Sequence, residues 1–510
     1  MSRKLLQSTA IVGAMTMISR VLGLVRDRVI AQYFGAGLGA DAFLVAFKIP
    51  NFLRRLFAEG AFSQAFVPIL SEYRSKKSHD ETHGLINSVA GTLALVLTIT
   101  TVVGVIAAPV LISIFAPGFI DNDEKFDLTV SLLRITFPYI LFISLTALAG
   151  GVLNTYKHFA GPAFTPVFLN ISIIGAAIWL APYLDQPVTA LAWGVFFGGI
   201  IQLLFQFPFL LKLKLFPILS LRRTDEGVRR ILRLMGPAIF GVSVSQINLL
   251  LDTLIASFLI TGSVSWLYFA DRLLEFPLGV FGIALGVVIL PSLSEKHAQG
   301  SKEHFSKMLD WAMRLVLIIA FPASIGLALL AAPMLSTLFQ YGEFSAHDVA
   351  LSSKALIAYS FGLLGFTLIK ILAPGYYSRQ DTKTPVKIGI IAMVSNMILN
   401  VILVFPLEHA GLALATSFSA FINAGLLYRG LRKQGVYNPE PGWVVLLIKV
   451  GISGLLMATV LWFYVPDLTQ WTEWTGFERV AQLGKWIIIG GGLYVGSLLM
   501  FGVRRRDLNL

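Results

Sequence analysis

The stretch INSVAGTLALVLTITTVVGVIAAPVLISI, residues 86–114, contains no charged residue. A helix needs about 20 residues to cross the roughly 30 Å hydrocarbon core of a bilayer, so this stretch is long enough for one crossing. Polar and apolar residues do not alternate along it as they do in a barrel strand, and helix is the conformation that satisfies its backbone hydrogen bonds in lipid. The stretch therefore predicts a transmembrane helix.

The composition extends this prediction to the whole chain. Of 510 residues, 56% are hydrophobic and only 13% are charged, with a mean hydropathy of +0.76; a soluble domain has about 25% charged residues. We therefore expect an all-α polytopic membrane protein with about 14 transmembrane helices. The predicted spans are 9–34, 40–67, 86–114, 127–153, 163–182, 187–211, 230–259, 264–292, 307–333, 347–373, 384–405, 409–428, 442–465 and 480–503.

The basic residues follow the expected topology of such a protein. Lys and Arg gather in alternate connections, including residues 74–77, 212–233, 296–307 and 504–506, and this pattern places both termini in the cytoplasm. The formal charge of +12 therefore reflects topology and does not indicate nucleic-acid binding. The sequence contains no cysteine, which excludes disulfides and thiolate metal ligands.

Two pairs of short matches indicate an internal repeat. PILSE at 68–72 resembles PSLSE at 291–295, and TPV at 165–167 recurs at 384–386, both at a displacement of about 220 residues. The matches predict two parallel six-helix lobes, residues 1–215 and 216–435, followed by a C-terminal helix pair at 436–510. The alternative is that Ser/Thr-Pro pairs recur at helix ends without a repeat.

Charged residues interrupt the first two apolar segments. Such a side chain at bilayer depth costs about 3 kcal/mol unless it faces water or protein, which makes it a candidate for function. In the second segment four charges fall within about 20° of one helical stripe, which we expect to face an aqueous cleft. The first segment carries Arg20, Arg26, Asp27 and Arg28, and the second carries this stripe of Asp41, Lys48, Arg55 and Glu59, with Asn51 near it and Arg54 off it.

A matching surface is expected on the segment 264–292. Ser265 and Arg272 lie seven residues apart on one face, with Asp271 and Glu275 beside them. Arginine holds phosphate through a planar, permanently charged fork, and neighbouring carboxylates can pair with it when the anion is absent. The alternative is that these charges form interhelical salt bridges or snorkel to the membrane interface.

Other patterns point away from catalysis. The sequence contains no GxxxxGK[ST] loop, no HExxH pair and no GxSxG elbow, so we expect neither ATP hydrolysis nor an enzyme site. Asp252, with Asn396 and Asn400, supplies oxygens that suit a monovalent cation, and ordinary polar packing is the competing explanation.

The sequence resembles the MurJ/MviN family of lipid II flippases in four stretches, residues 15–27, 39–73, 263–280 and 373–387. This family is part of the multidrug/oligosaccharidyl-lipid/polysaccharide exporter superfamily. The resemblance implies two six-helix lobes around a central cavity and a lipid-tail groove at the last two helices. It also implies a possible Na⁺ site at Asp252. The residues it assigns to the substrate are Arg20, Arg26, Arg54, Arg272, Ser19, Asn51 and Ser265, and those it assigns to gating or salt bridges are Asp41, Glu59, Asp271 and Glu275.

The function implied is movement of lipid II from the cytoplasmic to the periplasmic leaflet of the bacterial inner membrane by alternating access. The arginines would hold the pyrophosphate. No cofactor is expected, and Na⁺ or the membrane potential would supply energy. Expected partners are lipid II, membrane lipids and a cell-wall synthesis or division complex. The competing functions are a multidrug/cation antiporter, which would need an acidic cavity, and a membrane scaffold that does not transport.

Overall fold

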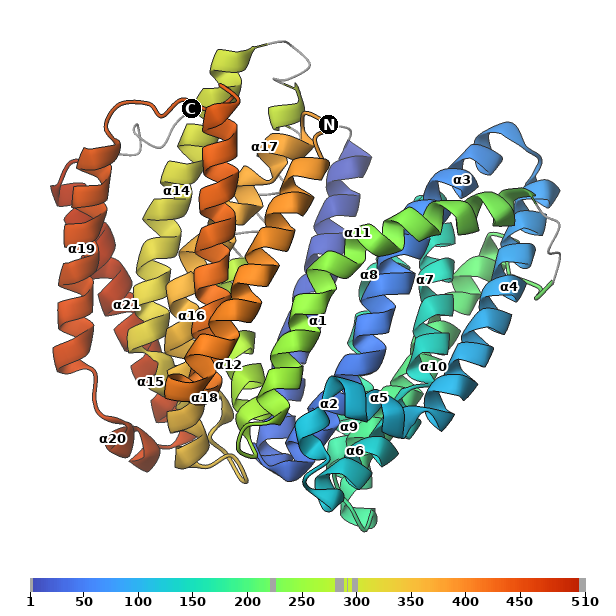
Figure 1. The fold of residues 1–510 in the computed structure, drawn as a ribbon, viewed down its shortest axis with the longest axis horizontal. Coiled ribbons are helices and arrows are strands. Elements are labelled where there is room, and N and C mark those ends of the chain that lie inside the picture. The colour runs from blue at the N-terminus through green and yellow to red at the C-terminus, as the bar shows by residue number, and fades with distance from the viewer. Residues whose placement is uncertain (1–2, 221–225, 280–288, 291, 296–300, 504–510) are drawn as a thin grey trace. The chain divides into compact units, whose positions relative to one another are not determined.

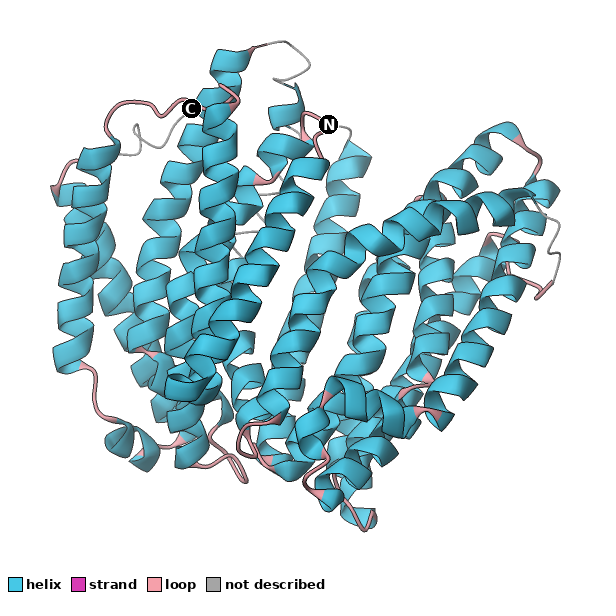
Figure 2. Ribbon diagram, viewed as in Figure 1, coloured by secondary structure: helices cyan, strands magenta, loops and turns pink. Residues whose placement is uncertain are grey.

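The computed structural model describes residues 3–220, 226–279, 289–290, 292–295 and 301–503, with side chains except at 3–11, 58–59, 240–245 and 247–249. Within these ranges every regular element is a helix, as Figure 2 shows. The chain divides into two compact units, Met1–Val264 and Ser265–Leu510. It has the all-α polytopic membrane fold that the composition predicts.

The first unit packs its long helices in neighbouring pairs. α1 lies against α8 and α9, α2 against α6, and α10 against α7 and α9. The elements are α1 (Arg3–Phe34), α2 (Leu38–Leu53), η1 (Arg54–Phe62), α3 (Ser63–Lys76), α4 (His79–Ile106), α5 (Ala108–Phe115), η2 (Pro117–Phe119), α6 (Asp123–Thr136), α7 (Tyr139–Thr155), α8 (Ala160–Phe164), α9 (Pro166–Gly175), η3 (Ala176–Leu180), η4 (Ala181–Tyr183), α10 (Thr189–Lys212) and α11 (Glu226–Ser257).

The helix α11 belongs to this unit by its packing. Val228 and Ile231 of α11 join a buried cluster with Phe66 of α3, Leu85 of α4 and Leu153 of α7. Figure 1 shows the first part of α11 running beside α3 and α4. The compact unit thus extends beyond residue 215, where the sequence places the repeat boundary, and the repeat itself stays a prediction.

The second unit is centred on α16, which packs against α14, α15 and α18. Its buried cluster includes Leu309 of α14, Ile371 of α16 and Leu427 of α18. The elements are α12 (Ser263–Pro277), which begins two residues before the boundary, α14 (Lys302–Leu329), α15 (Ala331–Phe339), α16 (Ala346–Leu372), α17 (Pro374–Tyr377), α18 (Lys383–Lys433), α19 (Trp443–Tyr464), α20 (Leu468–Glu473) and α21 (Gly476–Met500).

The element α18 is a hairpin of two helices and contains two of the predicted spans. Glu408 has φ 51° and ψ −131°, which are not helical values, and the chain reverses there. The Oγ of Ser419 donates to the carbonyl of Ala392 at 2.7 Å, which joins the two arms far from the turn. The predicted boundary between spans 384–405 and 409–428 falls at this reversal.

Two buried polar side chains, Arg479 and Asp310, attach the C-terminal helices α19 and α21 to the rest of the second unit. Arg479 of α21 is 8% exposed and donates to four main-chain carbonyls, those of Ser336, Gln340, Thr472 and Trp474, at 2.9–3.3 Å. At the other attachment, Asp310 of α14 accepts hydrogen bonds from Tyr437, from the main-chain N–H of Glu440 and from Trp443, at 2.7–3.2 Å, and pairs with Arg314 at 2.6 Å.

Among the described residues, nine helices are long and apolar enough to cross a membrane. One of these is α18, which supplies two of the predicted crossings. The predicted spans missing from the nine are 9–34, 40–67, 230–259 and 264–292. The first two are the segments that charged residues interrupt, and part of 264–292 lies outside the described residues.

Candidate functional site

Arg26 of α1 is held inside the first unit. Its side chain is 8% exposed, and it donates to Oδ1 of the adjacent Asp27 through Nε at 2.9 Å and through Nη2 at 2.7 Å. Nη1 donates to Oδ1 of Asn170 on α9 at 3.1 Å. Asn170 in turn donates to the main-chain carbonyl of Ser19 at 3.1 Å. These contacts fix a buried cation against α9.

Arg20 differs from Arg26 in its surroundings. It is exposed on α1, whereas Ser19 beside it is half-buried. An exposed guanidinium in an apolar helix is available to an anion without first breaking a buried ion pair. Arg20 is thus more accessible than Arg26 in this conformation.

Asp41 forms a second buried ion pair. Its carboxylate is 1% exposed, and Oδ2 accepts from Nζ of Lys125 on α6 at 2.9 Å and from the N–H of Gly262 at 2.7 Å. The Lys125 ammonium lies 4.1 Å from the ring centre of Phe119. The expectation that Asp41 faces an aqueous cleft is therefore wrong, because the carboxylate joins α2, α6 and the turn after α11.

A π-helix follows the part of the predicted stripe that holds Asp41 and Lys48. The segment η1 begins at Arg54, and its wider turn changes the side-chain phase that a regular α-helix would give. Arg54 is half-buried and donates from Nε to Oδ1 of Asn51 at 3.2 Å, while Arg55 is exposed. The predicted stripe assumes 100° per residue, a value that no longer holds from Arg54 onward. The side chain of Glu59 lies outside the described residues.

In the second unit, the candidate residues lie on α12. Nη1 of Arg272 donates to Oε2 of Glu275 at 2.7 Å, and Nη2 donates to the hydroxyl of Tyr268 at 3.3 Å. The Arg272 and Glu275 side chains are 34% and 48% exposed, and Asp271 is also exposed, so solvent reaches this group. Ser265 is fully buried.

Among the residues described, no group of three or more His, Cys, Asp or Glu side chains is placed to hold a metal ion. Asp252 is half-buried on α11. Within α18, Asn400 donates to Asn396 at 3.1 Å, and Asn396 donates to Thr416 at 3.2 Å. The cation site at Asp252 stays a prediction.

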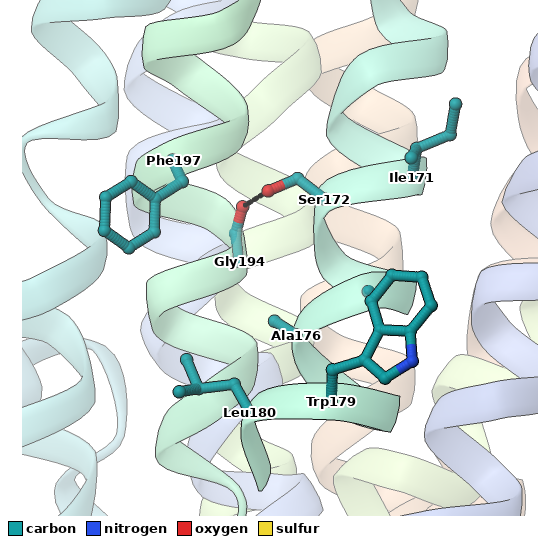
Figure 3. Close-up of a pocket in the computed structure, with 8 residues that line it drawn as sticks. Ile171, Ser172, Ala176, Trp179, Leu180, Gly194 and Phe197 are labelled. Atoms are coloured by element: carbon teal, nitrogen blue, oxygen red, sulfur yellow. Dashed lines mark hydrogen bonds between the residues drawn. The ribbon is translucent and has the colours of Figure 1, made fainter.

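A shallow groove of about 490 Å³ lies between α9, η3 and α10 in the first unit (Figure 3). Ile171, Trp179 and Phe197 line it, and each is at least 49% exposed. Beside the groove, the hydroxyl of Ser172 on α9 donates to the carbonyl of Gly194 on α10 at 2.7 Å. Because the lining is apolar and the helices are membrane spans, the groove suits lipid chains and not a charged headgroup.

Sequence reasoning missed three partners of the candidate residues. They are Lys125, Asn170 and Tyr268, which contact Asp41, Arg26 and Arg272 respectively. Lys125 offered a signal, since it is a single lysine among Asp121, Asp123 and Glu124. Asn170 and Tyr268 are ordinary residues of apolar helices, and nothing in their spacing distinguishes them.

Comparison with known proteins identifies the family of the chain. A family model described as lipid II flippase MurJ matches residues 30–481. The chain belongs to the lipid II flippase MurJ family. A probable lipid II flippase MurJ of Vibrio cholerae is 51% identical over 514 residues, which cover 99% of this chain and 98% of that protein. A lipid II flippase MurJ of Burkholderia cenocepacia is 44% identical, over 97% of this chain and 96% of that protein.

Solved structures agree with this assignment. A lipid II flippase MurJ in an inward closed conformation matches with a TM-score of 0.82 and 29% identity, over 98% of this chain and 99% of that chain. An inward-facing MATE family multidrug resistance transporter of the MOP superfamily matches with a TM-score of 0.70 at 15% identity, over 84% of this chain and 98% of that chain, and shows a shared fold alone. Membership in the MurJ family confirms a multi-pass membrane transporter and not an enzyme.

Proposed function

We propose that this chain flips lipid II from the cytoplasmic to the periplasmic leaflet of the bacterial inner membrane, with both termini in the cytoplasm. The observation that carries the proposal is the match over almost the whole chain to proteins named lipid II flippase. Lipid II carries a pyrophosphate between an isoprenoid tail and a disaccharide-pentapeptide. The protein must therefore hold a dianionic group while the tail remains in lipid.

Arg20 and Arg272 are the arginines best placed to take this pyrophosphate first. Arg20 is exposed, and Arg272 is partly exposed and forms an ion pair with Glu275. A phosphate oxygen can replace the Glu275 carboxylate on the same guanidinium, because both are anionic acceptors of matching geometry. Arg26 and Arg54 would join only if their contacts with Asp27, Asn170 and Asn51 rearranged during the transport cycle.

The proposed mechanism is alternating access driven by the membrane potential. Outward movement of negative charge across an inside-negative membrane is favourable by about 2.3 kcal/mol per charge per 100 mV. This contribution suits a chain in which we find no nucleotide-binding motif. Na⁺ coupling is a further source of energy, and cell-wall synthesis or division proteins are the proposed partners.

The test replaces Arg20 or Arg272 by Ala in cells that depend on this chain for flipping. We expect at least a tenfold loss of lipid II arrival at the outer leaflet, with normal protein abundance. Arg432→Ala, at an exposed position near the end of α18, is the matched control and should retain transport.

The Arg272→Lys variant separates charge from geometry. Lysine keeps the positive charge but loses the planar fork, so partial activity is expected. Loss of protein from the membrane in the Ala variants would indicate a scaffold role. Normal flipping by both variants at normal abundance would contradict the pyrophosphate assignment.

A further inference from the structure

An extended segment between α10 and α11 lies along α4 in the first unit. Residues 213–220, of sequence LKLFPILS, form neither helix nor strand. We call these residues the strap. Nε2 of His83 on α4 lies 2.8 Å from the carbonyl oxygen of Phe216. The side-chain oxygen of Asn87 accepts from the N–H of Ile218 at 2.8 Å, and its main-chain carbonyl accepts from the N–H of Ser220 at 3.3 Å. The strap is therefore fixed to α4.

Gly91 allows the end of the strap to approach the helix backbone. A Cβ atom at this position would overlap the main-chain atoms of Ser220, so no other residue fits without moving the strap. Asn87 and Gly91 lie eight and twelve residues from His79 at the start of α4. At 1.5 Å per residue, the strap reaches about 12–18 Å along a membrane span.

The face of α4 that carries the strap continues as a lipid-facing surface. Gly91 and Val102 are eleven residues apart, which separates their directions by only about 20°. Val102 is 53% exposed, and Ile99 and Ile106 nearby are 55% and 73% exposed. Exposed aliphatic side chains on a span are in contact with acyl chains. The strap thus covers the end of a surface that faces the bilayer.

Some side chains of the strap are buried against the first unit, and others are exposed. Leu215 is fully buried and Phe216 packs against the core cluster, whereas Ile218 and Leu219 are 67% and 65% exposed. Lys212, at the end of α10, and Lys214 are also exposed. Two adjacent exposed aliphatic side chains therefore lie on an anchored backbone close in sequence to two exposed lysines.

We infer that the strap is a binding site for anionic phospholipid of the cytoplasmic leaflet. Ile218 and Leu219 contact the upper part of the acyl chains, and Lys212 and Lys214 contact the phosphate. The charge complementarity and the location on a lipid-facing helix favour a bilayer phospholipid over a soluble anion. The site uses none of the residues proposed for the pyrophosphate, and lipid binding there can be measured without transport.

The first test measures binding by native mass spectrometry of the full-length protein in detergent, with phosphatidylglycerol or phosphatidylcholine added and no lipid II present. We expect preferential binding of phosphatidylglycerol. The double variant Lys212→Gln/Lys214→Gln should weaken the tightest site about 30-fold, the equivalent of about 1 kcal/mol for each lysine.

The matched control is Lys76→Gln/Lys77→Gln, which removes the same charge from the same unit. These lysines pair with Glu72 and Glu81, so little change in lipid binding is expected. An equal loss of binding in both double variants would overturn the inference, because it would indicate a response to net charge alone.

A second test uses the absence of cysteine from the sequence. A fluorophore on Leu219→Cys, in phosphatidylglycerol nanodiscs, should be quenched at least twofold more by brominated acyl chains than by aqueous iodide. The same label on Ser75→Cys, at an exposed position, should show the reverse order. Quenching of the strap label mainly by iodide would overturn the inference even if the lysine variants bind less lipid.

Discussion

Replacement of Lys125 by Ala tests the buried ion pair most directly. The two side chains are 5% and 1% exposed, and the Nζ to Oδ2 distance is 2.9 Å. Removal of one partner from such a pair costs about 3–5 kcal/mol, because it leaves the other charge buried without compensation. The N–H of Gly262 still donates to the Asp41 carboxylate at 2.7 Å, so we expect a loss near 3 kcal/mol, at the lower end of that range.

The control is an ion pair of shorter distance and greater exposure. Lys307 and Glu303 are 2.6 Å apart, but their side chains are 48% and 74% exposed. Lys307→Ala should change stability little, because solvent screens the pair. The comparison therefore separates the effect of burial on stability from the effect of the distance between the charged atoms.

The measurement is detergent-induced unfolding followed by tryptophan fluorescence, extended to a double-mutant cycle with Asp41→Leu. Loss of both charges should cost less than the sum of the single losses, with a coupling of at least about 2 kcal/mol. If Lys125→Ala and Lys307→Ala shift unfolding equally, or if the cycle is additive, burial of the pair does not contribute in the way we argue.

Two further predictions concern the second unit. Gly454→Leu should destabilise the protein by about 1–3 kcal/mol in the same unfolding assay, because its Cβ would overlap Phe321, whereas Gly451→Leu on the same helix meets open space and should be nearly neutral. Burial raises the pKa of Tyr437, whose hydroxyl donates to Asp310, so the folded state keeps this proton when the unfolded chain ionises near pH 10. Stability should therefore fall as pH rises above about 10. Tyr437→Phe should remove this fall while costing about 1.5–3 kcal/mol at pH 8, and an unchanged alkaline profile would contradict the assignment.

The existence and type of the helices could be predicted from the sequence because lipid leaves few alternatives. A long apolar run such as 86–114 has to satisfy its backbone internally, and α4 and α5 do so. Details that depend on local geometry could not be predicted in the same way. The π-helix at Arg54 has no composition signal, and the rule of 100° per residue fails beyond it.

The candidate arginines could be named from the sequence, but their partners could not. Charge in an apolar segment is visible in one dimension, whereas the partner of a charge depends on tertiary packing. Asp41 and Lys125 are 84 residues apart, and Arg26 and Asn170 are 144 apart. Arg26 and Asp41 are buried, whereas Arg20 and Arg272 are exposed or partly exposed. This difference follows from helix packing and cannot be read from the sequence.

The four hydrogen bonds that Arg479 donates affect which mutations this chain can tolerate. All four of its acceptors are main-chain oxygens, which every amino acid possesses. Mutations at the acceptor positions can accumulate without loss of the bonds, provided that the backbone path is kept. For these four hydrogen bonds, selection therefore acts on the Arg479 side chain and not on the side chains of its acceptors.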